Sequence, residues 1–114
     1  MSTMSAPSDE PIISQRQRAL LEAWAARYIW WKPVPDAMGY PRRIIAQVMN
    51  IGDYEDIQAL IEDFGEEALR DVVRHAEAGE FNARSWAYWH YRLSLVSLDA
   101  RAPMPPLPTR HVSQ

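Results

Sequence analysis

The amino-acid sequence predicts an all-α protein, folded as a compact bundle of about five helices. Apolar residues recur at helical spacing through most of the chain, whereas no segment alternates apolar and polar residues as a half-buried strand does. Proline and glycine stand between the apolar stripes, where they end one helix and allow the next to begin. Together these observations indicate helices packed on helices around one core.

The first helix is expected over residues 14–31. Lys32-Pro33-Val34-Pro35 then stops it, because proline lacks a backbone N–H and restrains the residue before it. The segment 33–40 contains two prolines and Gly39, so we expect it to form a loop over the core. The apolar residues of the first helix recur near helical spacing: Leu20, Leu21, Trp24, Ala25, Tyr28 and Trp31.

Three further helices are expected between Pro41 and Gly79. Pro41 suits the first position of the second helix, where its missing N–H costs no hydrogen bond. Asp53 suits the N-cap of the third helix, and Gly65 separates the third from the fourth, which makes these two a candidate antiparallel hairpin. Their apolar stripes are Ile44, Ile45, Val48 and Met49, then Ile57, Leu60, Ile61 and Phe64, then Leu69, Val72, Val73 and Ala76.

The fifth helix is expected from Ala83 to about Asp99, with Asn82 as its N-cap. Apolar residues occupy two sides of it, so it is either the central element of the core or is covered on one side by another chain. One side carries Trp86, Trp89 and Leu93, and the other carries Tyr88, Tyr91, Leu95 and Leu98.

Both ends of the chain are predicted to lie outside this single helical domain, which spans residues 14–99. Residues 1–13 are small and polar and contain two prolines, which predicts a flexible, disordered N-terminal tail. Residues 100–114 are rich in proline and favour an extended polyproline II ribbon.

Composition excludes several classes of protein. The chain has no cysteine, so disulfides, thiolate zinc sites and cysteine nucleophiles are ruled out. It has no run of roughly 20 apolar residues that would cross a bilayer, and no secretion signal is recognisable at its start, so we expect no membrane contact and a cytoplasmic location. The net charge of −3 and the seven carboxylates between Asp53 and Glu67 make nucleic acid an improbable direct ligand.

The sequence indicates no catalytic or metal site and no cofactor. The three histidines are not spaced as metal ligands, and no phosphate-binding glycine loop or nucleophile motif is present. His90, between two aromatic residues, is better explained as a core histidine with one hydrogen bond than as a titrating catalyst. The carboxylates of Glu62, Asp63, Glu66 and Glu67 are explained as a solvated acidic face.

We instead predict a binding surface for a protein partner. The two arginines after Pro41 oppose the helix dipole, which marks them either as contacts for an acidic partner or phosphate, or as side chains lying over aromatic rings. The last helix carries more tryptophan and tyrosine than one small core is expected to absorb. The candidate contacts are Arg42, Arg43, Arg84, Trp86, Tyr88, Trp89, His90, Tyr91 and Arg92, with Met104, Leu107 and Arg110 of the ribbon.

Part of the chain also resembles a known group of proteins. The stretches are Tyr40 to Asp56, Leu69 to Ala76 and Arg84 to Leu95, followed by a Pro-Pro-Leu-Pro tail. They resemble short bacterial antitoxin-like proteins encoded beside nucleotidyltransferase toxins of the abortive-infection type. The resemblance implies a protein that binds and neutralises such a toxin and has no catalytic residue itself. Related sequences tend to read Leu-Gly-Leu where this chain has Leu93-Ser94-Leu95, so we expect the last helix to continue further here.

Two alternatives remain open at this point. One is a small helical DNA-binding transcriptional regulator, with Arg42, Arg43, Arg70 and Arg74 on phosphates. The other is an enzyme that uses His90 with a nearby carboxylate. A homodimer paired through the aromatic helix is also compatible with the sequence.

Overall fold

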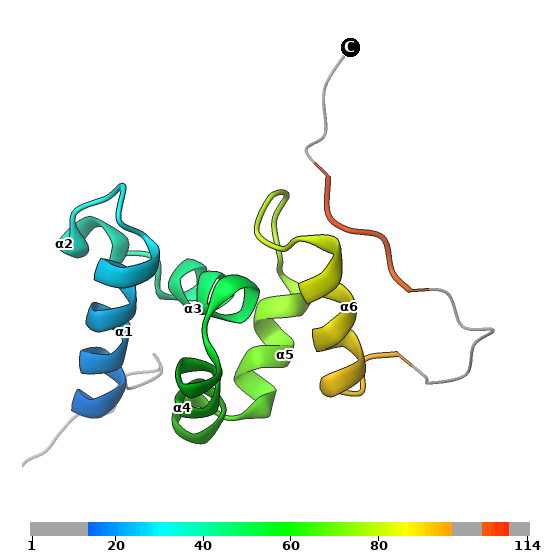
Figure 1. Cartoon of the computed structure of the whole chain (residues 1–114), viewed down its shortest axis with the longest axis horizontal. Helices are drawn as coiled ribbons and strands as arrows, with labels where there is room; N and C mark the ends of the chain where they lie inside the picture. The colour runs from blue at the N-terminus through cyan, green and yellow to red at the C-terminus, as the bar shows by residue number, and fades with distance from the viewer. Residues whose placement is uncertain (1–13, 97–103, 110–114) are drawn as a thin grey trace, which may run out of the picture.

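A computed structural model describes residues 14–96 and 104–109, and within these ranges the chain is all-helical, as predicted (Figure 1). The described part contains six helices and no strand, one helix more than the sequence indicated. The predictions made for residues 1–13, 97–103 and 110–114 lie outside the described residues. The helices are α1 (Gln15–Tyr28), α2 (Val34–Ala37), α3 (Pro41–Ile51), α4 (Tyr54–Phe64), α5 (Glu66–Arg74) and α6 (Ala83–Arg92).

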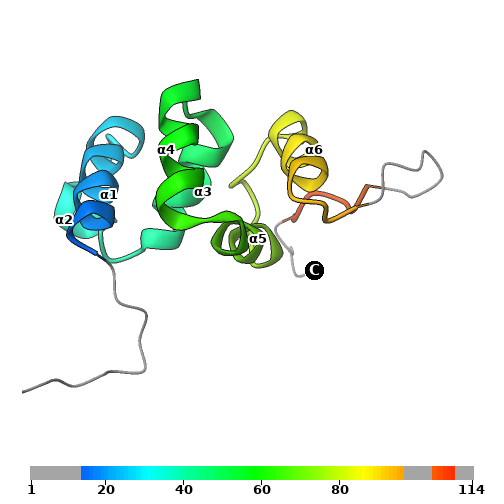
Figure 2. The same cartoon turned by 90° about the horizontal axis from the view of Figure 1, so that it is seen from below.

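Helix α3 is the centre of the fold, because it contacts each of the other five helices. Its sequence suits this place, since an isoleucine pair, an alanine, a valine and a methionine give it buried side chains over more than one face. Of the two alternatives for the last helix, the central position is wrong, because α6 lies at one side of the molecule (Figures 1 and 2). The buried residues of α3 are Ile44, Ile45, Ala46, Val48 and Met49.

The predicted N-caps of two helices are confirmed. The Asp53 side chain accepts a hydrogen bond of 2.8 Å from the backbone N–H of Asp56 at the start of α4. The Asn82 side chain accepts a bond of the same length from the N–H of Ser85 at the start of α6. Each cap satisfies one of the N–H groups that a helix leaves without an internal partner, so these helices begin where the sequence indicated.

The expectation for the end of the first helix is wrong. Helix α1 ends at Tyr28, and Trp31 leaves the buried stripe to become 55% exposed. Lys32 precedes a proline and is therefore restricted to extended backbone, which explains why the helix cannot reach it. The segment expected to be a loop contains the single-turn helix α2, and Pro35 stands in its first turn, where proline is tolerated.

The end of the last helix also differs from the expectation. Helix α6 ends at Arg92 instead of near Asp99, and Ser94 has a φ of 57°, in the left-handed region that favours glycine. The N–H of Leu95 donates to the carbonyl of His90 at 2.8 Å, and the N–H of Ser94 donates to that of Tyr91 at 3.2 Å. This pair of bonds is the Schellman helix stop. A serine thus takes the left-handed position that glycine usually occupies at such a stop, and the expected continuation of the last helix is wrong.

Helices α4 and α5 follow one another across Gly65 and pack together, as the hairpin prediction required. Gly65 has φ 85° and ψ 157°, a conformation that side-chain-bearing residues rarely adopt, so it turns the chain sharply between the two helices. Helix α5 ends at Arg74, before Ala76, so the fourth apolar stripe is shorter than predicted.

Candidate docking surface

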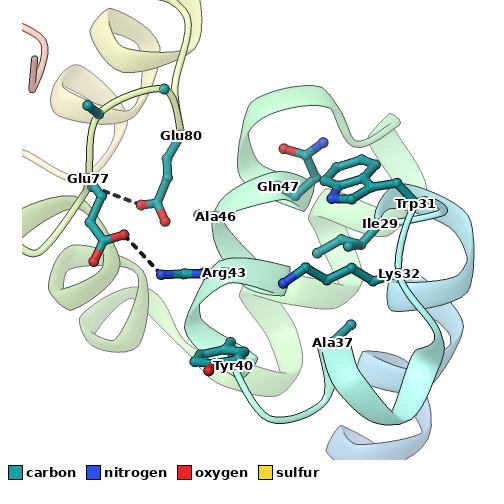
Figure 3. Close-up of a pocket in the computed structure, with 12 residues that line it drawn as sticks. Ile29, Trp31, Lys32, Ala37, Tyr40, Arg43, Ala46, Gln47, Glu77 and Glu80 are labelled. Carbon is teal, nitrogen blue, oxygen red and sulfur yellow. Dashed lines mark hydrogen bonds and ion pairs between the residues drawn. The ribbon is translucent and has the colours of Figure 1, made fainter. Parts of the chain in front are cut away.

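A hollow of about 340 Å³ opens between the turn after α1, the start of α3 and the loop from α5 to α6 (Figure 3). Ala46 of α3 and Ile29 after α1 lie at its apolar base, and Gln47 adds an amide. Aromatic and cationic side chains stand on one side, and two glutamates stand on the other. The hollow therefore offers both apolar surface and charge to a bound group.

The aromatic side of the hollow carries exposed rings. Trp31 and Tyr40 line it and are 55% and 53% exposed, and Trp30, which lies beside Trp31 outside the lining, is 76% exposed. The two indoles meet edge to face with ring centroids 5.6 Å apart. The Tyr40 ring lies beneath two cations, with the Arg43 guanidinium 4.8 Å and the Lys32 ammonium 5.5 Å from its centroid. We call these five residues the tryptophan face.

The opposite side is built from ion pairs that fix the loop to α3. Arg42 donates two hydrogen bonds to the Glu80 carboxylate, of 2.8 Å and 2.6 Å, and Arg43 contacts Glu77 at 3.4 Å. Burial alone would raise the pKa of Glu80, but the hydrogen bonds from Arg42 and from the Glu77 N–H, together with the charges of Arg42 and Arg43, outweigh it and lower that pKa below its ordinary value. The hydrogen bonds that Arg42 donates to Glu80 in turn raise the pKa of Arg42. The loop is thus held in place by charge-assisted bonds.

These contacts account for the two arginines at the start of α3. Their charge opposes the helix dipole, but the carboxylates of the following loop neutralise it within the chain. Arg43 also lies over Tyr40, which confirms the alternative of a side chain over an aromatic ring. Arg42 is committed to Glu80, so of the two only Arg43 remains on the tryptophan face.

The aromatic residues predicted on the last helix divide between the core and the surface. Trp86, Trp89 and His90 are buried, and the His90 ring nitrogen Nδ1 lies 2.8 Å from the carbonyl oxygen of Trp86. The Trp89 indole donates to the carbonyl of Met49 at 2.8 Å. His90 is therefore the core histidine with one hydrogen bond that the sequence favoured, and these three side chains offer little surface to a partner.

The remaining predicted residues of α6 are exposed but do not share one site. Arg84 and Tyr88 line a second hollow, of about 450 Å³, beside the end of α3. Tyr91 is 47% exposed, and Arg92 contacts Glu66 of α5 at 2.8 Å. The structure thus separates the residues that the sequence placed together.

Two residues of the C-terminal ribbon pack on the chain itself. Met104 and Leu107 are half-buried against the core, and the Trp86 indole donates a hydrogen bond of 2.7 Å to the carbonyl of Pro105. Residues 104–109 are without regular secondary structure, and Arg110 lies outside the described residues. The outer side of α6 is covered here by this chain's own ribbon.

The acidic run of α4 and α5 is largely paired within the molecule. Five arginines from other parts of the chain or from the same helix reach it, and the shortest contact is 2.6 Å. Within the described ranges, no group of three histidine or acidic side chains is arranged to hold a metal ion. The ion pairs are Arg16 with Asp63, Arg27 with Asp53 and Asp56, Arg70 with Glu66 and Glu67, Arg74 with Glu67, and Arg92 with Glu66.

Of the tryptophan face, the sequence prediction placed only Arg43 among the candidate contacts. Trp31 fell on the apolar stripe of the first helix, and Lys32 and Tyr40 stood at the borders of the predicted loop. The usable signal was Lys32-Pro33, because a helix that ends before this pair leaves two adjacent tryptophans in a turn, where at least one ring faces solvent.

Two wider searches complete the description of this surface. None of the helices described here is long and apolar enough to cross a membrane. Comparison with protein-family models, with curated proteins and with solved structures finds no match to this chain.

Proposed function

We propose that this chain is a non-catalytic protein-binding module that binds and neutralises a nucleotidyltransferase-type toxin, and that the tryptophan face is its docking surface. The class of partner comes from the resemblance of Tyr40–Leu95 to antitoxin-like proteins. The docking surface comes from the exposure of Trp30 and Trp31, the observation that carries the proposal.

Exposed tryptophan supports a docking role for a physical reason. Leaving apolar rings in water forfeits free energy that burial would supply, roughly 25 cal/mol for each Å² of apolar surface. Tryptophan, tyrosine and arginine are also the residues that most often dominate binding energy at protein interfaces. The tryptophan face combines two tryptophans, a tyrosine and an arginine in or beside a hollow, on the turn after α1 and at the start of α3.

The charges beside the rings define the partner's chemistry. Lys32 and Arg43 both lie over Tyr40, so the cations and the exposed rings occupy one patch. A complementary surface has an apolar side chain to enter the hollow and a carboxylate to meet Lys32. Mutating Lys32 should therefore change the salt dependence of binding more than the affinity at high salt.

The DNA-binding alternative is weakened by the ion pairs. It requires four arginines on phosphates, and each of the four contacts a carboxylate of this chain. A phosphate would have to displace those carboxylates, and the glutamates would repel it. The pairs are Arg42 with Glu80, Arg43 with Glu77, Arg70 with Glu66 and Glu67, and Arg74 with Glu67.

The experiment is co-expression with the product of the adjacent gene, which the proposal expects to be a nucleotidyltransferase, followed by co-purification and a growth assay. The wild-type chain is expected to co-purify and to restore growth. A Trp30→Ala, Trp31→Ala double variant should lose between about thirtyfold and a thousandfold in affinity, because each interface hot spot contributes roughly 2 kcal/mol and the two contributions need not add in full. Tyr54→Ala is the matched control, since Tyr54 is 75% exposed and lies outside the hollow.

Two results would contradict the proposal. Recovery of only free chain from cells that make the nucleotidyltransferase would show that this enzyme is not the partner. Equal binding by the double variant and the control would be compatible with this partner but would show that the tryptophan face is not the docking surface. Sedimentation of the isolated chain distinguishes a homodimer from both results.

A further inference from the structure

The C-terminal ribbon, residues 104–109, is bound to α6 in the manner of a peptide ligand (Figure 2). Met104 and Leu107 are spaced three residues apart and both pack against the core. A polyproline II helix has three residues per turn, so this spacing places both side chains on one edge of the ribbon. Between them the Pro105 carbonyl accepts a 2.7 Å hydrogen bond from the Trp86 indole.

The receiving side is an aromatic cluster held rigidly in place. The Phe81 and His90 rings lie 5.7 Å and 4.3 Å from the Trp86 ring, between centroids. His90 is fixed by its 2.8 Å contact with the Trp86 carbonyl. The orientation of the Trp86 indole is therefore set by the helical domain, and its N–H points at the ribbon.

Trp86 and Trp89 of the same helix differ in the acceptor that each indole N–H reaches. The Trp89 indole donates to Met49 of α3, inside the helical domain. The Trp86 indole donates to Pro105, which belongs to the ribbon. A buried indole N–H requires an acceptor, so Trp86 is satisfied only by what lies on the outer side of α6.

We propose that the outer side of α6, centred on Trp86, is a binding site for extended proline-rich peptides, and that residues 104–109 fill it in cis as a built-in competitor. The peptide it takes has two apolar side chains three residues apart, with prolines between them and after the second. An aromatic surface with an indole donor suits such a peptide, because the ribbon is already stiff and offers carbonyls. The occupant in trans is a Met-Pro-Pro-Leu-Pro-like segment of a partner protein. This site is separate from the tryptophan face and does not depend on the toxin proposal.

The cis ribbon sets the expected affinity for a peptide added in trans. A short covalent connection gives the ribbon an effective concentration on the order of 1 mM at its own site. If the intrinsic dissociation constant is about tenfold below that concentration, the ribbon weakens binding of a free peptide about tenfold. A variant whose ribbon is released from α6 should therefore bind the free peptide about tenfold more tightly than the wild-type chain.

The test uses the full-length chain with Met104→Ser and Leu107→Ser, which removes both apolar anchors and leaves the prolines. The probe is the capped peptide Ala-Pro-Met-Pro-Pro-Leu-Pro-Thr, followed by tryptophan fluorescence and by the NMR signal of the Trp86 indole N–H. We expect saturable binding to the double variant with a shift of its Trp86 signal, and about tenfold weaker binding to the wild-type chain, in which the peptide replaces a ribbon of the same sequence. Two controls should bind at least tenfold more weakly: a peptide with alanine in place of each proline, and the double variant with Trp86→Phe added.

Several outcomes would overturn the proposal. One is a double variant that keeps its helical circular dichroism and cooperative melting but does not bind the peptide. Another is equal affinity of the wild-type chain and the double variant, which would place the peptide elsewhere. If the double variant does not fold, the wild-type chain decides alone with the same peptide carrying a spin label at one end, and a Trp86 signal that this peptide does not broaden at saturation would refute the site.

Discussion

Replacing Ser94 by glycine should stabilise the protein. Ser94 has a φ of 57° at the stop of α6, and an L-residue in the left-handed region costs roughly 1 to 2 kcal/mol that glycine does not. Glycine has more freedom in the unfolded chain, which offsets about 0.5 to 1 kcal/mol of that gain. The net expectation is a free energy of unfolding higher by about 0.5 to 1 kcal/mol, or roughly 2 to 8 °C in Tm.

The assay is urea and thermal unfolding followed by circular dichroism, with Ser94→Ala as the matched control. Ser94 is exposed, so removing its hydroxyl should change little, and alanine keeps the strained backbone. We expect the Ser94→Gly variant to have a higher free energy of unfolding than the wild-type chain, and the Ser94→Ala variant to have no higher one. A Ser94→Gly variant that is no more stable than the alanine variant would refute the reasoning, because the left-handed backbone would then carry no strain.

Three further predictions concern other parts of the framework. Glu80→Gln should lower the free energy of unfolding by about 2 kcal/mol at neutral pH, because one partner of a charge-assisted pair with Arg42 is lost. The pKa of Glu80 is lowered from 4.5 by folding, so the stabilisation from its carboxylate is present above that pH and is lost as the pH falls through the folded-state pKa. The free energy of unfolding should therefore fall less steeply with acid in Glu80→Gln than in the wild-type chain. Ile44→Ala in the centre of α3 should cost about 3 kcal/mol in urea unfolding, and Ile51→Ala, half exposed on the same helix, should cost far less. Gly65→Ala should cost about 1 to 3 kcal/mol in thermal unfolding, because no neighbour blocks a Cβ there and the backbone conformation alone resists it.

The sequence predicted the helices most reliably where the caps and breakers are explicit. Asp53 and Asn82 mark two helix starts by side-chain chemistry, and Pro41 marks a third by its ring, so these boundaries follow from local physics. The end of α6 has no such mark. Ser94 adopts a conformation that its residue type disfavours, so only the packing of the whole molecule imposes the stop.

The docking residues were harder to predict for a different reason. Helical spacing tells which residues share a face, but it does not tell what that face meets. The sequence predicted Trp86 and Trp89 as surplus aromatic surface. The fold instead buries Trp89 against Met49 and Trp86 beneath the ribbon. Trp30 and Trp31 carry the exposure instead, because α1 ends three residues earlier than its apolar pattern suggested.

The position of α3 governs the order in which this protein acquires structure during synthesis. Helices α1 and α2 leave the ribosome before α3, and α3 is the element on which both pack. An isolated helix as short as α1 is only marginally stable in water, so its apolar stripe stays open to solvent until residues 41–51 emerge. The nascent chain is therefore most exposed to proteases over that interval, and a pause in translation that keeps residues 41–51 inside the ribosome should prolong it.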